Sequence, residues 1–586
     1  MRVGEKPIVD KLKISTLGRG TLFFLWLLSL ALLPWLVMGP FGHHLVPLWR
    51  RAVVFGPIAL GGAVVLKAVW PNQSWFKVLL IASLSYGVAY QVATYIPGIS
   101  TYPLSLGWSE ASRYYYASLY FSKQIYGIAV PPTVLHPSRY LMQAAPFLIP
   151  NLPIWFHRLW QVLLWLGFAL GTAILLARRL TIPDRMQRWL FVAWAFLFIF
   201  QGPVYYHLLV MVMIVLAGFN RQRFWQSMIA VGLASIWAGI SRINWFPVPA
   251  MLATALYFLE QNTEKKPLWQ YLLPPILWVG LGTSLAFLSQ SAYIAWSGNP
   301  SGQFGSSLTS DLLWYRLFPN VTYRMGILPS IFVASLPLGL LILFRLVGRW
   351  RRYHPIRILG LVGILLALFA VGIVVSVKIG GGSNLHNLDA YLIALLIMGS
   401  TIYYGKFVED DPEPERQPQP AWGLVSLAVI VPVLFTLSLG GPVSSPNWAK
   451  AREAIREVQG TVDTAVQGGG KVLFITERQL LTFHTLEGVP LELDYEKVFL
   501  MEMGMSNNSP YLTTLYDYLR NQRFALIISE PMAIQYQGRT HQFGEENDAW
   551  VKRVAEPVLC YYQPQTTFHE VAVQILVPRQ GGSSCP

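Results

Sequence analysis

Side chains able to do chemistry gather in a long polar segment, 96–156, between two apolar stretches. Its only carboxylate is Glu110, which lies three positions before Arg113. A carboxylate at the mouth of a helical bundle can take a proton from an acceptor hydroxyl or hold a divalent metal ion. The alternative is a solvated loop residue paired with Arg113. The rings of Trp108 and Tyr114 are of the kind on which a sugar packs, although both types are also ordinary at membrane interfaces.

A second group lies in the glycine-rich segment KIGGGSNLHNLDAYL, 378–392, beside an apolar stretch. Its three glycines let the backbone approach a ligand closely, and Lys378 could neutralise a phosphate. Ionisable groups at membrane depth are costly and indicate function. The alternative is a tight interfacial turn in which Asp389 caps the next helix. On the functional interpretation, the ligand-binding residues here are Asn384, His386 and Asp389.

Cationic side chains recur in other segments between the apolar stretches. An arginine matches phosphate oxygens with a planar fork of donors. Each one singly is better explained as an interface anchor, but together they indicate an anionic ligand. His207, inside an apolar stretch, is expected to be a satisfied buried histidine. The candidate anion contacts are His136, Arg139, Arg242, Arg316 and Arg324, with Asn244 and Asp311 as polar neighbours.

These groups must be positioned by membrane helices. Of 586 residues, 54% are hydrophobic and 12% are charged, against roughly a quarter charged in an ordinary soluble domain. Apolar runs of about 20 residues, enough to cross about 30 Å of hydrocarbon, recur along most of the chain. They predict an all-α polytopic bundle of about thirteen transmembrane helices. The expected spans are 20–38, 52–69, 76–95, 157–177, 188–201, 203–218, 226–241, 245–259, 271–290, 327–347, 356–376, 389–405 and 422–439.

Basic residues give the bundle an orientation. Lysine and arginine clusters fall in alternate loops, which places those loops and the N-terminus in the cytoplasm and the C-terminus outside. The first apolar run has no small-residue cleavage site after it, so it is expected to be a retained helix. The net charge of +15 belongs to these loops, and no nucleic-acid partner is expected. The protein is expected in a plasma or inner membrane, with the loops 96–156, 291–326 and 378–388 outside.

After the last span the composition changes. Residues 445–586, here named the C-terminal domain, are predicted to form a soluble extracytoplasmic α/β domain after a transmembrane domain that spans 1–440. Short apolar runs have the length of buried strands, and two longer amphipathic segments suit helices. The strands are expected at 471–476, 524–529 and 571–578, and the helices at 448–466 and 511–522.

Three further features qualify this organisation. The Pro-rich acidic segment 409–420 is typical of a flexible linker. In the segment 96–156, here named the first loop, the amphipathic stretch 111–126 is expected to form a helix in the interface plane. Cys560 and Cys585 fit no metal pattern. They either form a disulfide or stay as free thiols.

The acidic first loop, its helix-compatible stretch and the re-entry His136-Pro137…Pro146 resemble the GT-C superfamily of integral-membrane glycosyltransferases. The similarity covers the arrangement of about 76–440, and many members also have a soluble domain after the last span. The resemblance implies a polyprenyl-phosphate sugar as donor and a glycan, lipid or protein as acceptor. It implies Glu110 as general base. The departing phosphate would be held by Lys378 with Arg242, Arg316 or Arg324.

The family's first loop often carries an Asp/Glu pair, and here only Glu110 matches. A divalent cation, Mg²⁺ or Mn²⁺, is the one cofactor candidate. Two other classes of protein stay open. A transporter or flippase of a lipid-linked glycan should place ionisable residues inside spans near the midplane, whereas most lie here in outer loops. The best argument for a non-catalytic scaffold that binds lipid or glycan is that this loop carries a single carboxylate. The enzyme hypothesis requires Glu110 and segment 378–392 to converge in one pocket.

Overall fold

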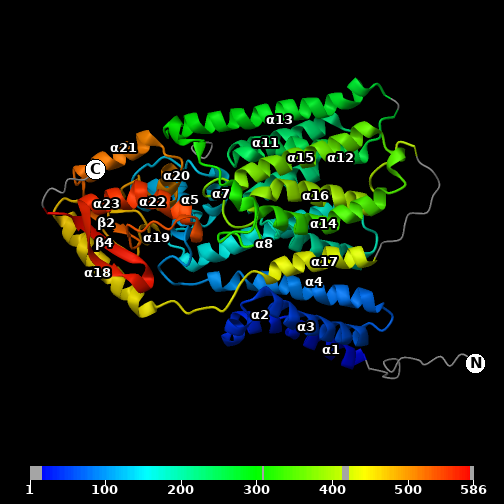
Figure 1. Cartoon of the computed structure of the whole chain (residues 1–586), viewed down its shortest axis with the longest axis horizontal. Coiled ribbons are helices and arrows are strands. Elements are labelled where there is room, and N and C mark those ends of the chain that lie inside the picture. The colour runs from blue at the N-terminus through cyan, green and yellow to red at the C-terminus, as the bar shows by residue number, and fades with distance from the viewer. Residues whose placement is uncertain (1–15, 265, 306–308, 412–421, 581–586) are drawn as a thin grey trace, which may run out of the picture.

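The structure is a computed structural model that describes residues 16–264, 266–305, 309–411 and 422–580. Most of the chain is helical, and long apolar helices lie side by side in a bundle (Figure 1). The helices of the bundle are α1 (Thr16–Ser29), α2 (Leu32–Met38), α3 (Leu48–Val69), α4 (Trp75–Ala93), α8 (Ile154–Arg179), α9 (Arg185–Ile199), α10 (Tyr206–Gly218), α11 (Phe224–Gly239), α12 (Val248–Glu260), α13 (Leu268–Ser297), α14 (Ile327–Leu346), α15 (Pro355–Ser376), α16 (Asp389–Tyr403) and α17 (Trp422–Leu437).

Within the described residues, seven helical segments are long and apolar enough to cross a membrane, as expected of a multi-pass membrane protein. The shorter helices α10, α11 and α17 are also apolar. Every predicted span is helical, but the predicted number of about thirteen crossings is not confirmed, because the other helices are shorter than a full span. The seven candidates are Thr16–Met38, Leu48–Val69, Trp75–Gly98, Ile154–Arg179, Leu268–Ser297, Ile327–Leu346 and Pro355–Ser376.

Helices α12 and α16 form the centre of the bundle, since nearly all of their residues are buried. Helix α13 instead exposes large apolar side chains, among them Ile276 at 62% and Leu288 at 64%. It packs on α11 so closely that a Cβ on Gly239 would lie 2.3 Å from the carbonyl oxygen of Ala286. Apolar exposure along a 30-residue helix fits contact with lipid.

Two arginines, the half-buried Arg179 and the buried Arg357, form polar contacts that join the ends of α8, α12 and α15. Arg179 forms a two-point ion pair with Glu260, with both nitrogen–oxygen distances at 2.8 Å. The fully buried Arg357 donates to Asp410 at 2.6 Å and to the carbonyl oxygen of Phe258 at 2.8 Å. Asp410 is the second residue of the segment predicted as a linker, 409–420, most of which lies outside the described residues. Its first residues are therefore held by the bundle.

The described part of the C-terminal domain contains a four-stranded sheet of order β1-β2-β4-β3. Strands β1 and β2 are parallel, and the other two pairs are antiparallel. The three predicted strands are confirmed as β1, β2 and β4. The edge strand β3, YQPQTTF, was missed because it is polar and contains a proline. The bounds are β1 (Lys471–Phe474), β2 (Phe524–Ser529), β3 (Tyr562–Phe568) and β4 (Val573–Pro578).

Helices surround this sheet, and the two predicted from the sequence are confirmed as α18 and α21. Cys560 is disulfide-bonded, while Cys585 lies outside the described residues. The helices of the domain are α18 (Trp448–Gln467), α19 (Gln479–Thr482), α20 (Lys497–Met505), α21 (Ser509–Arg520), α22 (Gly544–Trp550), α23 (Glu556–Tyr561) and a π-helical turn at Val551–Ala555.

The first loop folds into short helices that lie between the bundle and the sheet (Figure 1). The helix predicted at 111–126 is broken after Ser118, and α5 is enclosed by protein. Ser112 and Tyr116 donate hydrogen bonds to the buried Glu496 of the C-terminal domain. The stretch is therefore not the single interfacial helix expected. The helices of this loop are α5 (Glu110–Ser118), α6 (Ser122–Tyr126) and α7 (Pro137–Gln143).

Short 3₁₀ turns complete the described chain and mark most loop corners. They are Pro40–Leu45, Ile96–Gly98, Leu119–Phe121, Ala145–Leu148, Ile243–Trp245, Ser301–Gln303, Trp314–Leu317, Trp350–Arg352, His386–Leu388, Gly538–Thr540 and His569–Val571.

Candidate functional site

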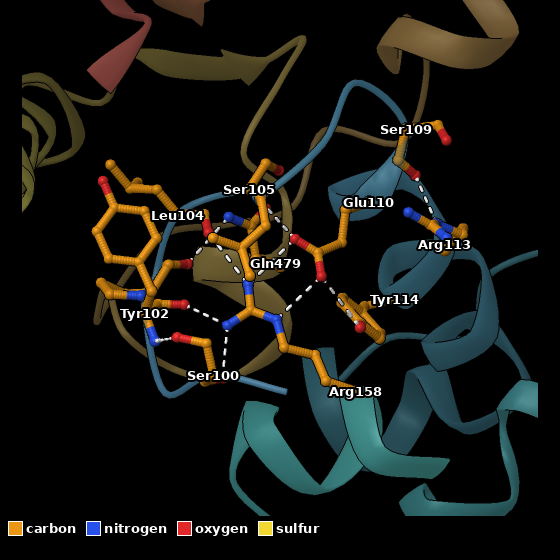
Figure 2. A network of polar contacts seen from close by, with 12 residues as sticks. Ser100, Tyr102, Leu104, Ser105, Ser109, Glu110, Arg113, Tyr114, Arg158 and Gln479 are labelled. Atoms are coloured by element: carbon orange, nitrogen blue, oxygen red, sulfur yellow. Dashed lines mark hydrogen bonds and ion pairs between the residues drawn. The ribbon is translucent and has the colours of Figure 1, made fainter. Parts of the chain in front are cut away.

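Glu110 lies at the start of α5 and is almost fully buried, 7% exposed. Its Oε1 accepts from Arg158 Nε at 2.9 Å and from the Tyr114 hydroxyl at 3.3 Å (Figure 2). Its Oε2 accepts from Arg158 Nη2 at 3.1 Å and from the backbone N–H of Leu106 at 2.6 Å. An ionised carboxylate has about four lone-pair positions. All of them are engaged here, so this carboxylate is the centre of a buried ion pair.

Arg158 extends the ion pair into the first loop. It also donates to the carbonyl oxygens of Ser100, Tyr102 and Leu104 at 2.6, 2.7 and 3.2 Å (Figure 2). The pair thereby fixes the beginning of the loop to α8. Arg113, the partner considered from the sequence, instead donates to the carbonyl oxygen of Ser109 at 3.3 Å. Sequence reasoning missed Arg158, although an arginine at the start of an apolar span is a signal in itself.

A second polar centre forms around the ring of Tyr205, the residue before α10. The guanidinium carbons of Arg139 and Arg242 lie 4.8 and 5.9 Å from this ring centre. The imidazole rings of His207 and His386 lie 5.7 and 6.1 Å from it. His136 joins the group because its ring lies 6.2 Å from that of His207. These six residues, with Asp389, are named the Tyr205 cluster.

The local sequence explains why these side chains meet. His136 precedes Pro137, which begins α7, and Arg139 follows on the same short helix. Arg242 precedes the turn that leads into α12. His386 lies in the turn that leads into α16. Residues at the N-terminal ends of α10, α12 and α16 therefore lie near one another, and the positive partial charge of a helix N-terminus favours an anion.

Asp389, the first residue of α16, orients Arg242. Its Oδ1 accepts from Trp245 Nε1 at 3.0 Å and from the N–H of Ala390 at 2.7 Å. Its Oδ2 lies 3.7 Å from Arg242 Nη1, while Arg242 Nη2 donates to Asn387 Oδ1 at 2.8 Å. Asp389 is 0% exposed. Two guanidinium groups against one carboxylate leave the cluster with a net positive charge.

Several buried atoms of the Tyr205 cluster have no hydrogen-bond partner among the described residues. They are Arg139 Nε, both ring nitrogens of His207, Arg242 Nη1 and Asp389 Oδ2. His207 is 1% exposed, so the expectation that it is buried is confirmed, but neither of its ring nitrogens has the expected hydrogen-bond partner among the described residues. A buried unpaired polar group costs about 1–3 kcal/mol. The two guanidinium nitrogens and one nitrogen of His207 are donors, and unpaired donors of this kind fit a site that binds an anionic ligand.

The histidines at the edge of the cluster are neutral in the free protein. Burial, followed by the positive charges of Arg242 and Arg139, lowers the pKa of His136 and of His386 to about 3. A bound anion would oppose the two guanidinium charges. It would therefore raise the proton affinity of both rings.

The affinity for a polyprenyl phosphodiester is accordingly expected to rise as the pH falls from about 8 to about 5.5, because anion binding takes up protons. A diester keeps the same charge over this range, so the ligand does not contribute to the change. Titration calorimetry in two buffers of different ionisation enthalpy measures both the affinity and the proton uptake. In the His136→Asn/His386→Asn variant the pH dependence is expected to be lost. Affinity independent of pH in the wild type would contradict the expectation.

Arg316 is not part of the Tyr205 cluster. It is fully buried and forms a two-point ion pair with Glu546, with both distances 2.7 Å, and it also reaches Glu545 at 3.3 Å. Both Nη nitrogens of Arg316 are thus bound to carboxylates of the C-terminal domain. Glu546 Oε1 also accepts from the N–H of Gly380 at 2.8 Å. Glu546 therefore joins the loop 291–326 to the glycine-rich segment.

Apart from Asn384, whose Oδ1 lies 2.5 Å from Nδ1 of His386, the other predicted residues lie outside the contacts of the Tyr205 cluster. Burial lowers the pKa of Lys378, which interacts electrostatically with Glu502. Tyr114 is buried against Glu110 instead of offering a sugar surface. Trp108 is exposed, with the ammonium of Lys497 4.7 Å from its ring. Arg324, Asp311 and Asn384 are exposed, and Asn244 is half-buried.

Among the described residues, no group of three or more His, Cys, Asp or Glu side chains is arranged to hold a metal ion, and the divalent cation stays a prediction. A scan against protein-family models finds no match. No curated protein matches the chain either.

Proposed function

We propose that the protein is an integral-membrane glycosyltransferase that moves a sugar from a polyprenyl-phosphate donor to an acceptor hydroxyl on the extracytoplasmic side. The Tyr205 cluster is the observation that carries this proposal. It brings His136, Arg139, Arg242, His386 and Asp389, all selected from the sequence as ligand contacts, into one cationic group at the ends of apolar helices.

A lipid-linked phosphate suits this arrangement chemically. The forks of Arg139 and Arg242 match phosphate oxygens. During transfer the phosphodiester becomes a monoester, so its negative charge grows. Prepositioned cations stabilise that growing charge, which is usually the largest contribution to catalysis. The apolar helices beside the cluster offer the surroundings that a polyprenyl chain needs.

The disulfide at Cys560 supports an extracytoplasmic C-terminal domain, because disulfides persist in oxidising compartments. The basic loops predicted for the cytoplasm support the same orientation. The hydrogen bond between Glu546 and Gly380 supports the same side of the membrane for the glycine-rich segment. We propose the sugar transfer on this side of the membrane.

The transporter hypothesis is less well supported. In a transporter the substrate site lies near the bilayer midplane, often at broken helices. The Tyr205 cluster instead joins loop residues and helix ends. A transfer assay distinguishes the enzyme from a scaffold that binds the same lipid without transferring the sugar.

The test uses purified full-length protein in lipid nanodiscs with radiolabelled polyprenyl-phosphate sugars and membrane acceptors. Incorporation of label into the acceptor supports the enzyme. Donor binding without incorporation supports the scaffold, and movement of intact donor between leaflets supports the flippase. The Glu110→Gln variant tests the base predicted from the sequence, since undiminished transfer per folded molecule removes Glu110 from the reaction.

Arg242→Gln is expected to lower kcat/KM about 10²–10³-fold, the usual loss when one donor to the developing charge is removed. Glutamine keeps a hydrogen-bond donor toward Asn387 but removes the positive charge. Arg520→Gln is the matched control, because Arg520 is 64% exposed on α21 and lies in the C-terminal domain. Steady-state kinetics of both variants gives the comparison. Equal kinetic constants for the two variants would exclude Arg242 from the site.

A further inference from the structure

We infer that His386, oriented by Asn384, is the general base that takes the proton from the acceptor hydroxyl. This inference rests on the proposed function and deepens it. The residue lies in the turn before α16, at the edge of the Tyr205 cluster, and its side chain is half-buried.

A general base needs a free lone pair within reach of the acceptor. Glu110 has none, because Arg158, Tyr114 and Leu106 occupy all four lone-pair positions of its carboxylate. Asp389 has a free oxygen, but that atom is buried and faces Arg242. Neither carboxylate is therefore placed to receive a proton from a ligand that enters the cluster.

His386 meets the requirement. Its Nδ1 lies 2.5 Å from Asn384 Oδ1, which also accepts the backbone N–H of His386 at 2.9 Å. An amide oxygen can only accept, so Nδ1 carries the ring proton. In the neutral imidazole, Nε2 then holds the lone pair. An amide that fixes the tautomer of a histidine in this way orients a base for catalysis.

Two neighbouring residues, Gly382 and Tyr205, also limit the position of the His386 ring. Gly382 has φ of +82°, and a Cβ there would lie 2.7 Å from His386 Cε1. A larger residue at this position would therefore displace the ring. A second neighbour is Tyr205, whose ring also lies near the guanidinium groups of Arg139 and Arg242. The base and the two phosphate-binding groups thus share one aromatic support.

In the transfer step, the acceptor hydroxyl gives its proton to His386 Nε2 while its oxygen bonds to the anomeric carbon of the sugar. The bond from that carbon to the phosphate oxygen breaks, and its electron pair stays on the phosphate. Arg139 and Arg242 hold the resulting phosphate monoester. The imidazolium afterwards returns its proton to water, which restores the base.

The inference is tested with His386→Asn, which keeps a hydrogen-bond donor at the position of Nδ1 but removes Nε2. We expect kcat to fall about 10²–10⁴-fold, the usual contribution of a general base, with the donor KM changed less than about threefold. His541→Asn is the matched control, because His541 is exposed and its Nδ1 also contacts a nearby oxygen. Added imidazole is expected to restore part of the activity of His386→Ala. A kcat near that of the wild type in His386→Asn would overturn the inference.

A second measurement applies whether or not these variants fold. In the Asn384→Asp variant a carboxylate replaces the amide beside Nδ1 and stabilises the imidazolium. The acidic limb of the kcat–pH profile is then expected to move to higher pH by about one unit, whereas Glu110→Gln leaves it in place. If the acidic limb does not move in Asn384→Asp, the proton of the acceptor hydroxyl is taken by a group other than His386. If the wild type itself transfers no sugar from any donor, the proposed function fails, which is a different result from transfer that does not depend on His386.

Discussion

Replacing Arg158 with methionine is expected to destabilise the folded protein by about 3–5 kcal/mol, the usual cost of leaving one partner of a buried ion pair uncompensated. The side chains of Arg158 and Glu110 are 1% and 9% exposed, so water cannot replace the lost partner. The three carbonyl oxygens that Arg158 also binds lose their donors at the same time. Thermal unfolding of the purified protein in detergent measures the loss.

Two companion variants identify the cause. Arg113→Met removes a half-buried arginine with a single hydrogen bond to its own turn, and its effect is expected to be below about 1 kcal/mol. Adding Glu110→Gln to Arg158→Met removes the orphaned charge and is expected to recover part of the stability. Equal melting temperatures for Arg158→Met and Arg113→Met would show that the ion pair does not hold the first loop.

Glu546→Gln is the second change with a large expected effect. It removes the charge of the closer partner of the fully buried Arg316 and leaves Glu545, at 3.3 Å, as its ionised partner among the described residues, at an expected cost of about 3–5 kcal/mol. It also weakens the acceptor for Gly380, which belongs to the segment that carries His386 and Asp389. We therefore expect kcat to fall more than tenfold even in the molecules that stay folded. Unfolding and sugar transfer are measured on the same preparation.

Glu545→Gln serves as the matched control, because Glu545 touches Arg316 at 3.3 Å and makes no hydrogen bond to the glycine-rich segment within the described residues. Its kcat is expected to stay within about threefold of the wild type. If both variants lose stability but neither loses activity, Glu546 stabilises the contact with the C-terminal domain and does not position the glycine-rich segment for catalysis.

The sequence predicted the helices well because apolar runs of about 20 residues have few alternatives to the helix in lipid. It also selected most members of the Tyr205 cluster, since ionisable groups next to apolar stretches are costly unless they are used. Tyr205 itself was missed. Aromatic residues are so common at membrane interfaces that nothing in the pattern YYH distinguishes a ring around which cations gather.

The environment of Glu110 could not be predicted. Its partner Arg158 is 48 positions away in the chain, and such a pairing depends on how the first loop folds back on α8. Arg316 is paired with a carboxylate of the C-terminal domain, and Lys378 interacts electrostatically with another. Residue type and local spacing carry no information on contacts made across the whole chain.

The enclosure of α5 by the C-terminal domain has a consequence for biogenesis. Ser112 and Glu496 are separated by 384 positions, and Tyr115 binds the carbonyl oxygen of Leu493 across a similar interval. During synthesis the first loop reaches its side of the membrane long before its partner has left the ribosome. In that interval it lacks the contacts that shape it, so nascent chains should be most open there to proteases and chaperones.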